Sequence, residues 1–214
     1  MQVKILGSAA GGAFPQWNCA CSNCRNVRAG AFHGKPRSQA NQVTWIDFEP
    51  GKQFFLRNTQ GEDSGLRCQA LALSTHYPSY VTPGRQSQLA ADEASLGFII
   101  QSPSGSRLAY LPSVPQLGDV LLEQIDGCSV LLFDGTFWSD DELIRIQGSG
   151  QTARQMGHIP VEETLVRLAG VRRPRKIFLH VNNTNPMLDE ASQQYRQVRA
   201  AGWEIAEDGW QFNL

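Results

Sequence analysis

The sequence lacks both a net charge and a long hydrophobic run. Nineteen basic and twenty acidic side chains give its 214 residues a formal charge of −1 at pH 7. This balance provides no global field that would attract nucleic acid or an anionic lipid surface. The apolar runs are too short to cross a bilayer, and the residues before Gly7 leave no room for the hydrophobic region of a signal peptide. We therefore expect a cytoplasmic protein that neither binds nucleic acid nor inserts into a membrane.

Cysteine is also scarce, and its distribution argues against a disulfide framework. The chain has five cysteines, an odd number, and Cys19, Cys21 and Cys24 fall within one short stretch. Thiolates at C-x-C-x-x-C spacing can converge on one cation, and Zn²⁺ favours sulfur ligands in a tetrahedron. Reduced cysteines around a metal also suit a cytosolic protein. We predict a structural zinc site here, with a fourth ligand from a distant segment. Ordinary buried thiols are the alternative.

The order of the remaining segments predicts an α/β fold in a single domain. A chain of this length can bury one sizeable core, and it contains no internal repeat. Strands are predicted over Val3–Leu6, Gln42–Phe48, Gln53–Leu56, Leu66–Leu73, Ser95–Ile100, Arg107–Leu111, Ser129–Phe133 and Lys176–Leu179. Helices are predicted over Val114–Ile125, from Pro160 to Gly170 and over Glu190–Ala201, with a closing hairpin over Trp203–Leu214. This order implies sheets with helices packed outside them.

Three metal-binding side chains in the C-terminal half fall at strand ends or at a helix start. Asp134 follows one predicted strand, His180 ends another, and His158 stands just before Pro160. Side chains at the carboxyl ends of strands in a layered α/β fold point into the crevice where ligands bind. Two imidazoles and one carboxylate are the minimum set for a non-haem iron or zinc centre. The alternatives are capping or core histidines, and an Asx-turn at Asp134.

Other polar residues are weaker candidates. His76 lies in a loop beside Tyr77-Pro78, and His33 is expected at the surface, where completion of the cysteine site is its alternative role. The acidic run Asp140–Glu142 is interpreted as the solvated start of a helix. The glycine-rich segment Gly7–Gly12 lacks the Lys-Ser/Thr ending of a phosphate-binding loop and is not interpreted as one.

Five motifs spread over nearly the whole chain carry a resemblance to a known family. They are Gly7-Ser8-Ala9-Ala10-Gly11-Gly12, Phe14-Pro15-Gln16-Trp17-Asn18-Cys19, Asp134-Gly135-Thr136, Met156-Gly157-His158 and His180-Val181-Asn182-Asn183-Thr184-Asn185-Pro186. Together they resemble the pyrroloquinoline quinone (PQQ) biosynthesis protein B family of the metallo-β-lactamase superfamily. The resemblance implies a metallo-β-lactamase-like, four-layered αββα sandwich formed by residues 1–214.

The resemblance also implies an activity. That family is associated with metal-dependent oxygenation of the tyrosine-derived ring of a cross-linked, peptide-derived Glu–Tyr intermediate. Hydroxylating a phenol with dioxygen requires a redox metal, which points to Fe²⁺ rather than zinc. His158 and His180 would then be a metal ligand and a substrate-facing acid/base, and Asp134 would orient an imidazole.

Two other functions stay open at this point. One is non-catalytic binding or transport of PQQ or its precursor, and the other is a metal-dependent phosphodiesterase or related hydrolase of the same superfamily. For both the oxygenase and the carrier, the expected partner is a small molecule, namely PQQ or its precursor. The oligomeric state is open, and a homodimer is among the alternatives.

The sequence departs from the superfamily pattern in its metal ligands. The H-x-H-x-D-H loop, or its shortened Asp-His version, is absent after Leu56, and an internal segment is therefore expected to be missing near residues 58–65. The bridging Asp of the superfamily is also replaced, at Pro112-Ser113. In a phosphonate-pathway cyclic phosphodiesterase with the same cysteine spacing, the fourth zinc ligand is a His at the position of Asn183 here. Asn183 is therefore a candidate neighbour of the zinc site.

Overall fold

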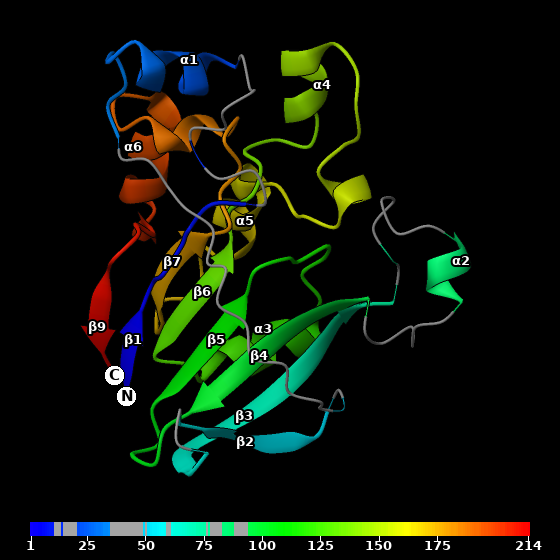
Figure 1. The fold of residues 1–214 in the computed structure, drawn as a ribbon, viewed down its shortest axis with the longest axis vertical. Coiled ribbons are helices and arrows are strands. Elements are labelled where there is room, and N and C mark those ends of the chain that lie inside the picture. The colour runs from blue at the N-terminus through cyan, green and yellow to red at the C-terminus, as the bar shows by residue number, and fades with distance from the viewer. Residues whose placement is uncertain are drawn as a thin grey trace.

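A seven-stranded sheet forms the centre of the molecule in the computed structural model, which describes residues 1–10, 14, 21–34, 49, 51–58, 61–75, 77, 83–87 and 94–214 (Figure 1). In spatial order, its strands are β2 (Gln53–Arg57), β3 (Asp63–Ser74), β4 (Ser95–Gln101), β5 (Arg107–Leu111), β6 (Val130–Asp134), β7 (Arg175–Leu179) and β8 (Trp203–Ile205). Neighbours from β2 to β5 are antiparallel, and those from β5 to β8 are parallel. A second sheet pairs β1 (Gln2–Lys4) with β9 (Gln211–Asn213).

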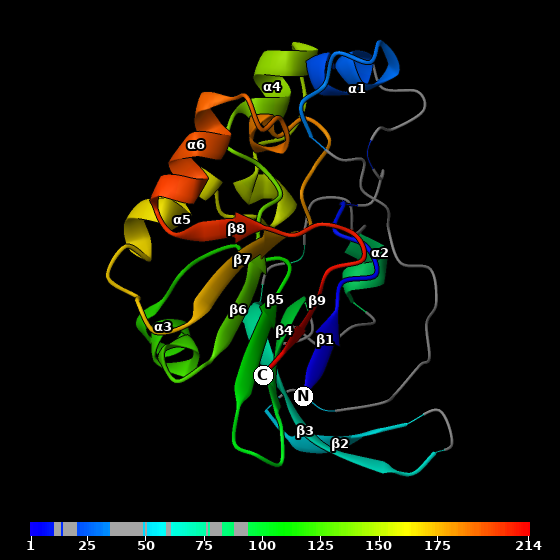
Figure 2. The same cartoon turned by 90° about the vertical axis from the view of Figure 1, so that its left-hand side faces the viewer.

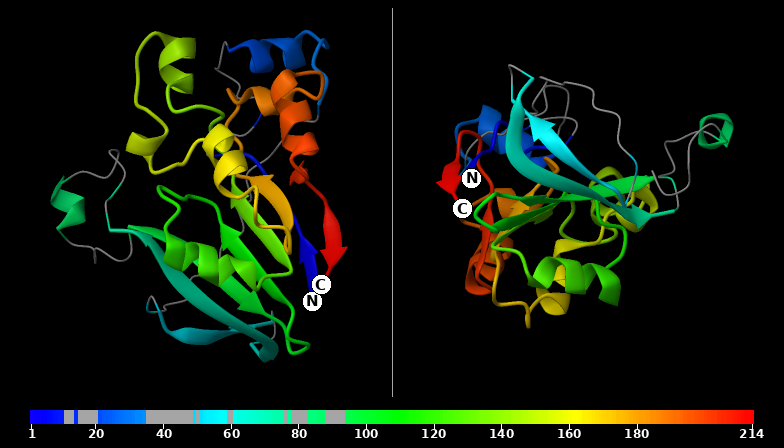
Figure 3. Two further views of the ribbon diagram at one scale, coloured as in Figure 1. Left: turned by 180° about the vertical axis from the view of Figure 1, so that it is seen from behind. Right: turned by 90° about the horizontal axis from the view of Figure 1, so that it is seen from below.

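Helices cover one face of the large sheet, and the small sheet lies on the other. Figure 2 shows α3 (Asp119–Asp126), α5 (Val161–Arg167) and α6 (Gln193–Ala200) on one side and β1 and β9 on the opposite side. The view from behind in Figure 3 shows α3 and α5 in front of the strands. The predicted α/β architecture with outer helices is therefore confirmed.

The other helices are short and lie toward the ends of the strands. α1 (Ser22–Arg28) and α4 (Glu142–Gln147) lie at the end of the molecule toward which β6 and β7 point, and α2 (Pro83–Gln86) lies to the side (Figure 1). The 3₁₀ helices are η2 (Arg154–Met156) and η3 (Pro186–Leu188). None of the described helices is long and apolar enough to cross a membrane.

The central strands are buried on both faces. Along β6, Leu131 and Phe133 belong to the core beneath the helices, whereas Val130 and Leu132 belong to the core beneath the small sheet. All five residues of β6 are buried, which explains the continuous apolar run in the sequence. These two cores fix β6 and β7 firmly, and the carboxyl ends of these strands carry the candidate site.

Most strand predictions are confirmed, but the predicted closing hairpin is wrong. The predicted strands between residues 53 and 179 correspond to β2 through β7. The predicted hairpin over Trp203–Leu214 does not form, because β8 pairs with β7 in the large sheet while β9 pairs with β1 in the small one. The buried side chains of Trp203 and Ile205 belong to the core under the helices, so their strand joins the large sheet. The predicted strand Gln42–Phe48 lies outside the described residues.

The predicted helices are shorter in the structure. The helix expected from Val114 begins only at Asp119, since Pro115 disfavours a helical conformation at the preceding residue and the Val114 amide bonds to Asp134 instead. The helix ends at Asp126, and the next residue, Gly127, has φ −80°, outside the left-handed region. The last helix starts at Gln193, after a cap in which Ser192 Oγ accepts from the Tyr195 amide.

Candidate functional site

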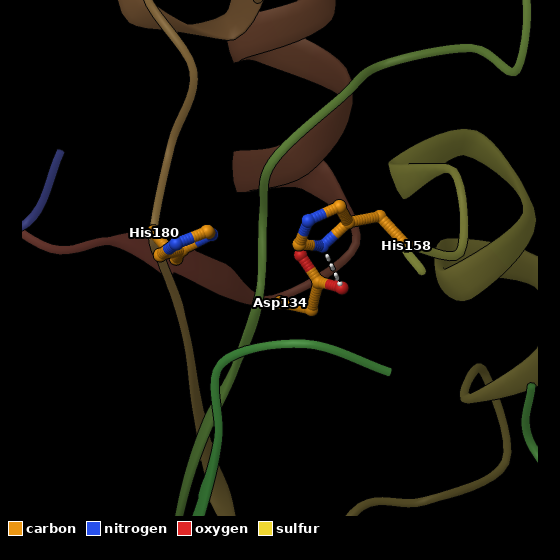
Figure 4. Close-up of side chains that lie close together, drawn as sticks. All are labelled: Asp134, His158 and His180. Atoms are coloured by element: carbon orange, nitrogen blue, oxygen red, sulfur yellow. Dashed lines mark hydrogen bonds and ion pairs between the residues drawn. The ribbon is translucent and has the colours of Figure 1, made fainter. Parts of the chain in front are cut away.

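Asp134, His158 and His180 lie together at the carboxyl ends of β6 and β7 (Figure 4). Their ligand atoms all lie within 4.8 Å of one another. Asp134 is the last residue of β6 and His180 directly follows β7, so the parallel register of these strands brings the two residues side by side. The rings of His158 and His180 stack with centroids 5.3 Å apart. The structure thus unites three residues that are distant in sequence.

The carboxylate of Asp134 is fully buried and fully hydrogen-bonded. Its Oδ2 accepts from the Val114 amide at 2.9 Å and contacts His158 Nδ1 at 2.8 Å. Its Oδ1 accepts from the amide of Thr136 at 3.1 Å and from the hydroxyl of the same residue at 2.6 Å. The Asx-turn that was the alternative interpretation of Asp134 is therefore present as well. Four contacts occupy the four acceptor positions of a carboxylate.

Thr136 is a site residue whose role the sequence analysis missed. Its side-chain oxygen lies 2.8 Å from His180 Nδ1 and 3.1 Å from His158 Nδ1, in addition to its contact with Asp134. Its position two residues after a strand end was the available signal, but only the structure gives its distance from the two histidines. The hydroxyl is thus the junction between the carboxylate and both imidazoles.

His180 has an unusual backbone conformation. With φ 56°, it is the one non-glycine residue with a positive φ among the described residues. The two amides that follow His180 support this conformation, because Val181 N donates to Ser8 O and Asn182 N donates to Thr136 O. Burial lowers the pKa of His180 below its ordinary value of 6.5; the charge of Asp134 opposes this effect and His158 adds to it. The neutral imidazole, able to accept a proton or to ligate a metal, is therefore favoured at neutral pH.

Gly135 allows the loop after β6 to lie against β7. Its amide donates to Leu179 O at 2.8 Å. A Cβ atom at this position would lie 2.9 Å from the Cβ of Phe178 and 3.0 Å from Leu179 O. A glycine between Asp134 and Thr136 is therefore needed for the close approach of the two site loops.

The cysteine region lies next to the polar segment that follows His180. Cys21 and Cys24 are buried, and Nδ2 of Asn183 lies 3.7 Å and 3.4 Å from their sulfur atoms. Asn23 donates to the carbonyls of Asn183 and Asn185, which joins α1 to this segment. The structure thus brings together Cys21, Cys24 and Asn183, three of the four residues assigned to the zinc region. The fourth, Cys19, lies outside the described residues.

Of the two weaker histidine candidates, His33 belongs to neither group of described residues. His33 is exposed, and its carbonyl accepts from the amide of Glu190. His76 lies outside the described residues.

The acidic run does begin a helix, α4, but the interpretation of Glu142 as solvated is wrong, because this residue is buried. It is only 3% exposed and accepts from the Trp138 amide and the Thr184 hydroxyl. Burial raises its pKa to about 7, against the opposing effect of these hydrogen bonds. These two partners belong to different loops. Glu142 thereby links the loop after β6 to the loop after β7.

Comparison with known proteins gives consistent similarities. A family profile described as "Beta-lactamase superfamily domain" matches residues 16–181. Coenzyme PQQ synthesis protein B from Pseudomonas putida (strain W619) is 30% identical over 303 aligned positions, which cover 100% of each chain. Because this chain has 214 residues, the alignment includes long stretches of the relative without a counterpart here.

Solved structures share the fold. The crystal structure of Zn(2+)-bound PqqB from Methylobacterium extorquens superposes with a TM-score of 0.84 and 25% identity over 100% of both chains. A diphosphatase from the PhnP family superposes with a TM-score of 0.57 and 13% identity, over 100% of this chain and 97% of that one, which is a likeness of fold alone. The metallo-β-lactamase-like fold expected from the sequence is confirmed. Among the described residues, its second sheet contains two strands.

Proposed function

Because this chain belongs to the β-lactamase superfamily and, within it, to the coenzyme PQQ synthesis protein B family, we propose that it carries out a metal-dependent step on a PQQ precursor. The proposed reaction is oxygenation of the tyrosine-derived ring of a peptide-derived Glu–Tyr intermediate. The observation that carries this proposal is the cluster of Asp134, His158 and His180, whose ligand atoms lie within 4.8 Å of one another.

The donor atoms of this cluster fit an iron ion. Imidazole is a suitable ligand for iron, and His158 and His180 would hold the ion. When bound, iron supplies the activation of dioxygen that hydroxylation of a phenol requires. Asp134 already accepts hydrogen bonds at every position, so its part is to orient His158.

The chain's own residues provide proton acceptors at the site. Asp134 Oδ2 can only accept, so the hydrogen bond of 2.8 Å to His158 holds a proton on Nδ1 of that ring. Where His158 does not ligate the ion, its Nε2 would be the base that accepts the phenolic proton of the substrate. The lowered pKa of His180 keeps its imidazole neutral, which is the form a metal binds.

A second metal has a structural part in this proposal. Cys19, Cys21 and Cys24 would hold Zn²⁺, with Asn183 beside them. Thiolates are the preferred ligands of structural zinc, and a related protein of the same family has been crystallised in a Zn(2+)-bound form. A zinc ion here would join α1 to the segment that follows His180 and so support the site.

Non-catalytic binding or transport of PQQ or its precursor is the second candidate function. It is favoured by the ligand count, because the described residues offer two imidazoles and a carboxylate that is already hydrogen-bonded. A hydrolase with a dinuclear centre would require more ligands than these, and we do not propose it.

Iron loading followed by turnover tests the proposed reaction. The protein is loaded with Fe²⁺ without oxygen, then given oxygen, ascorbate and a tyrosine-containing Glu–Tyr intermediate. One oxygen atom enters the ring and the other leaves as water, with the two electrons for its reduction supplied by ascorbate, and the product is analysed by mass spectrometry. We expect a catechol product from the wild type, loss of bound iron in His180→Ala, and normal iron binding in the control His33→Ala. A chain that binds iron tightly and forms no product would favour the carrier function.

A further inference from the structure

We propose that Thr136 is a positioning residue that holds the proton of His180 on Nδ1 and so leaves Nε2 of that ring free to bind. This inference rests on the proposed function in one respect only, that the ligand of Nε2 is a metal ion. The position of the proton follows from the chain's own hydrogen bonds and is testable without any metal.

The first step is the direction of the Thr136 hydroxyl. Its single proton can go to one acceptor, and three polar atoms are within reach: Asp134 Oδ1, His180 Nδ1 and His158 Nδ1. The contact with Asp134 is the shortest, at 2.6 Å, a length typical of a hydroxyl donating to a carboxylate. Backbone amides of Val114 and Thr136 also donate to this carboxylate, as expected for an acceptor-only group. The hydroxyl proton therefore points to Asp134.

The second step follows from that direction. Once its proton is given to Asp134, Thr136 Oγ1 presents only lone pairs to the imidazoles. His180 Nδ1, at 2.8 Å, must then be the donor, because two unprotonated atoms at this distance would leave both unsatisfied in a buried site. His158 donates from Nδ1 to Asp134 Oδ2. Both neutral rings therefore carry the proton on Nδ1, and both Nε2 atoms are unprotonated.

The third step is the rigidity of Thr136 itself. Its side chain is 2% exposed, and its branched Cβ restricts the rotation of χ1. Its carbonyl accepts from the Asn182 amide at 3.0 Å, while its side-chain oxygen contacts His180, so one residue holds the ring of His180 and the backbone two residues after it. A non-glycine residue in a left-handed conformation is energetically disfavoured and persists only where its neighbours impose that conformation. Thr136 is one of the groups that impose it on His180.

Nitrogen NMR of the metal-free protein tests this assignment directly. With ¹⁵N-labelled histidine, long-range ¹H–¹⁵N spectra at pH 8 distinguish the two neutral tautomers. We expect the Nδ1–H form for both His158 and His180 in the wild type and in Thr136→Ser, which keeps the hydroxyl. In Thr136→Val, which has nearly the same shape but no hydroxyl, His180 should shift toward the Nε2–H form while His158 stays unchanged. Wild-type His180 protonated on Nε2 would overturn the proposal, and this result needs no variant to fold.

Iron affinity gives a second measurement. Chelator competition with Fe²⁺ should show binding about 10–100-fold weaker in Thr136→Val and nearly unchanged in Thr136→Ser, the range expected when a group that orients a ligand is lost. If the wild type binds no iron but shows both Nδ1–H tautomers, the proposed function fails and this inference stands. If iron binds equally well to all three chains and the His180 tautomer does not change in Thr136→Val, this inference fails alone.

Discussion

Glu142 is a single residue on which two loops of the candidate site depend. Its buried carboxylate accepts from the Trp138 amide, in the loop after β6, and from the Thr184 hydroxyl, in the loop after β7. Burial raises its pKa from 4.5 to about 7. Between pH 4.5 and about pH 7, Glu142 therefore keeps its proton in the folded protein but has released it in the unfolded chain. The contribution of Glu142 to stability is therefore greatest below about pH 4.5 and is lost as the pH rises through 7.

We predict that the stability of Glu142→Gln depends less on pH than that of the wild type, because the variant lacks the titrating carboxylate. The amide is neutral at every pH, so from pH 5 to pH 8 the variant should lose less free energy of unfolding than the wild type. Urea unfolding at four pH values across this range measures the difference. An identical slope in both proteins would contradict the raised pKa of Glu142.

A second prediction at this scale concerns Asp134. In Asp134→Asn, one carboxylate oxygen becomes an NH₂ group, so two of the four donor contacts now made by Val114, His158 and Thr136 lose their acceptor. We expect a loss of about 2–4 kcal/mol in the free energy of unfolding, the range for a broken buried network. The exposed Asp126 provides a matched control, since Asp126→Asn should change stability by less than about 0.5 kcal/mol. A stable Asp134→Asn protein would mean that the carboxylate is not an essential acceptor.

The candidate site was predictable in part from single residues. Asp134, His158 and His180 are metal-binding types at strand ends or before a helix, and the pattern alone identified them. Thr136 and Glu142 were not identified, because their partners His180 and Thr184 are 44 and 42 residues away in the sequence. Ser and Thr hydroxyls and acidic runs are common on surfaces, so only the packing of the two loops distinguishes these two residues.

At the scale of elements, the contact between β6 and β7 depends on the absence of a side chain at Gly135. An added Cβ would meet the Cβ of Phe178 at 2.9 Å and the carbonyl of Leu179 at 3.0 Å, and neither atom can move away easily. We predict that Gly135→Ala lowers the free energy of unfolding by about 1–3 kcal/mol through overpacking. Thermal unfolding measures the loss.

Gly170 provides the control for that substitution. An added Cβ there meets nothing within 4 Å, so Gly170→Ala should leave stability unchanged or slightly higher. Equal destabilisation by both substitutions would mean that the close approach at Gly135 is not the cause.

Elements with strong local signals were predicted well, and those defined by distant partners were not. Apolar runs such as Val130–Phe133 identify buried strands because both faces are covered. The last two strands, Trp203–Ile205 and Gln211–Asn213, are short and flank a turn with Gly209 at φ 86°. This local pattern would be the same if the two strands paired with each other or if each paired with a different strand. The choice depends on which core buries their side chains, which no local pattern encodes.

At the scale of the whole molecule, the chain is shorter than its relatives. The alignment with the Pseudomonas putida relative has 303 positions, whereas β2 and β3 here are adjacent antiparallel strands in which the amide of Asn58 donates to Glu62 O. We propose that an internal segment of the family is missing from this chain. Intact-protein mass spectrometry should give 23.6 kDa, and a mass larger by several kilodaltons would contradict the proposal.

The pairing of β1 with β9 has a consequence for the order of assembly during synthesis. Ser8 bonds through its amide and hydroxyl to Asp208, and the neighbouring Ala9 pairs with Val181, beside His180. During synthesis, Ser8 and Ala9 are made long before Val181 and Asp208. The amino-terminal segment can therefore reach this arrangement only after nearly the whole chain has been synthesised. The proposed zinc site, which includes Asn183 from the same late part of the chain as a neighbour, would be completed at that stage as well.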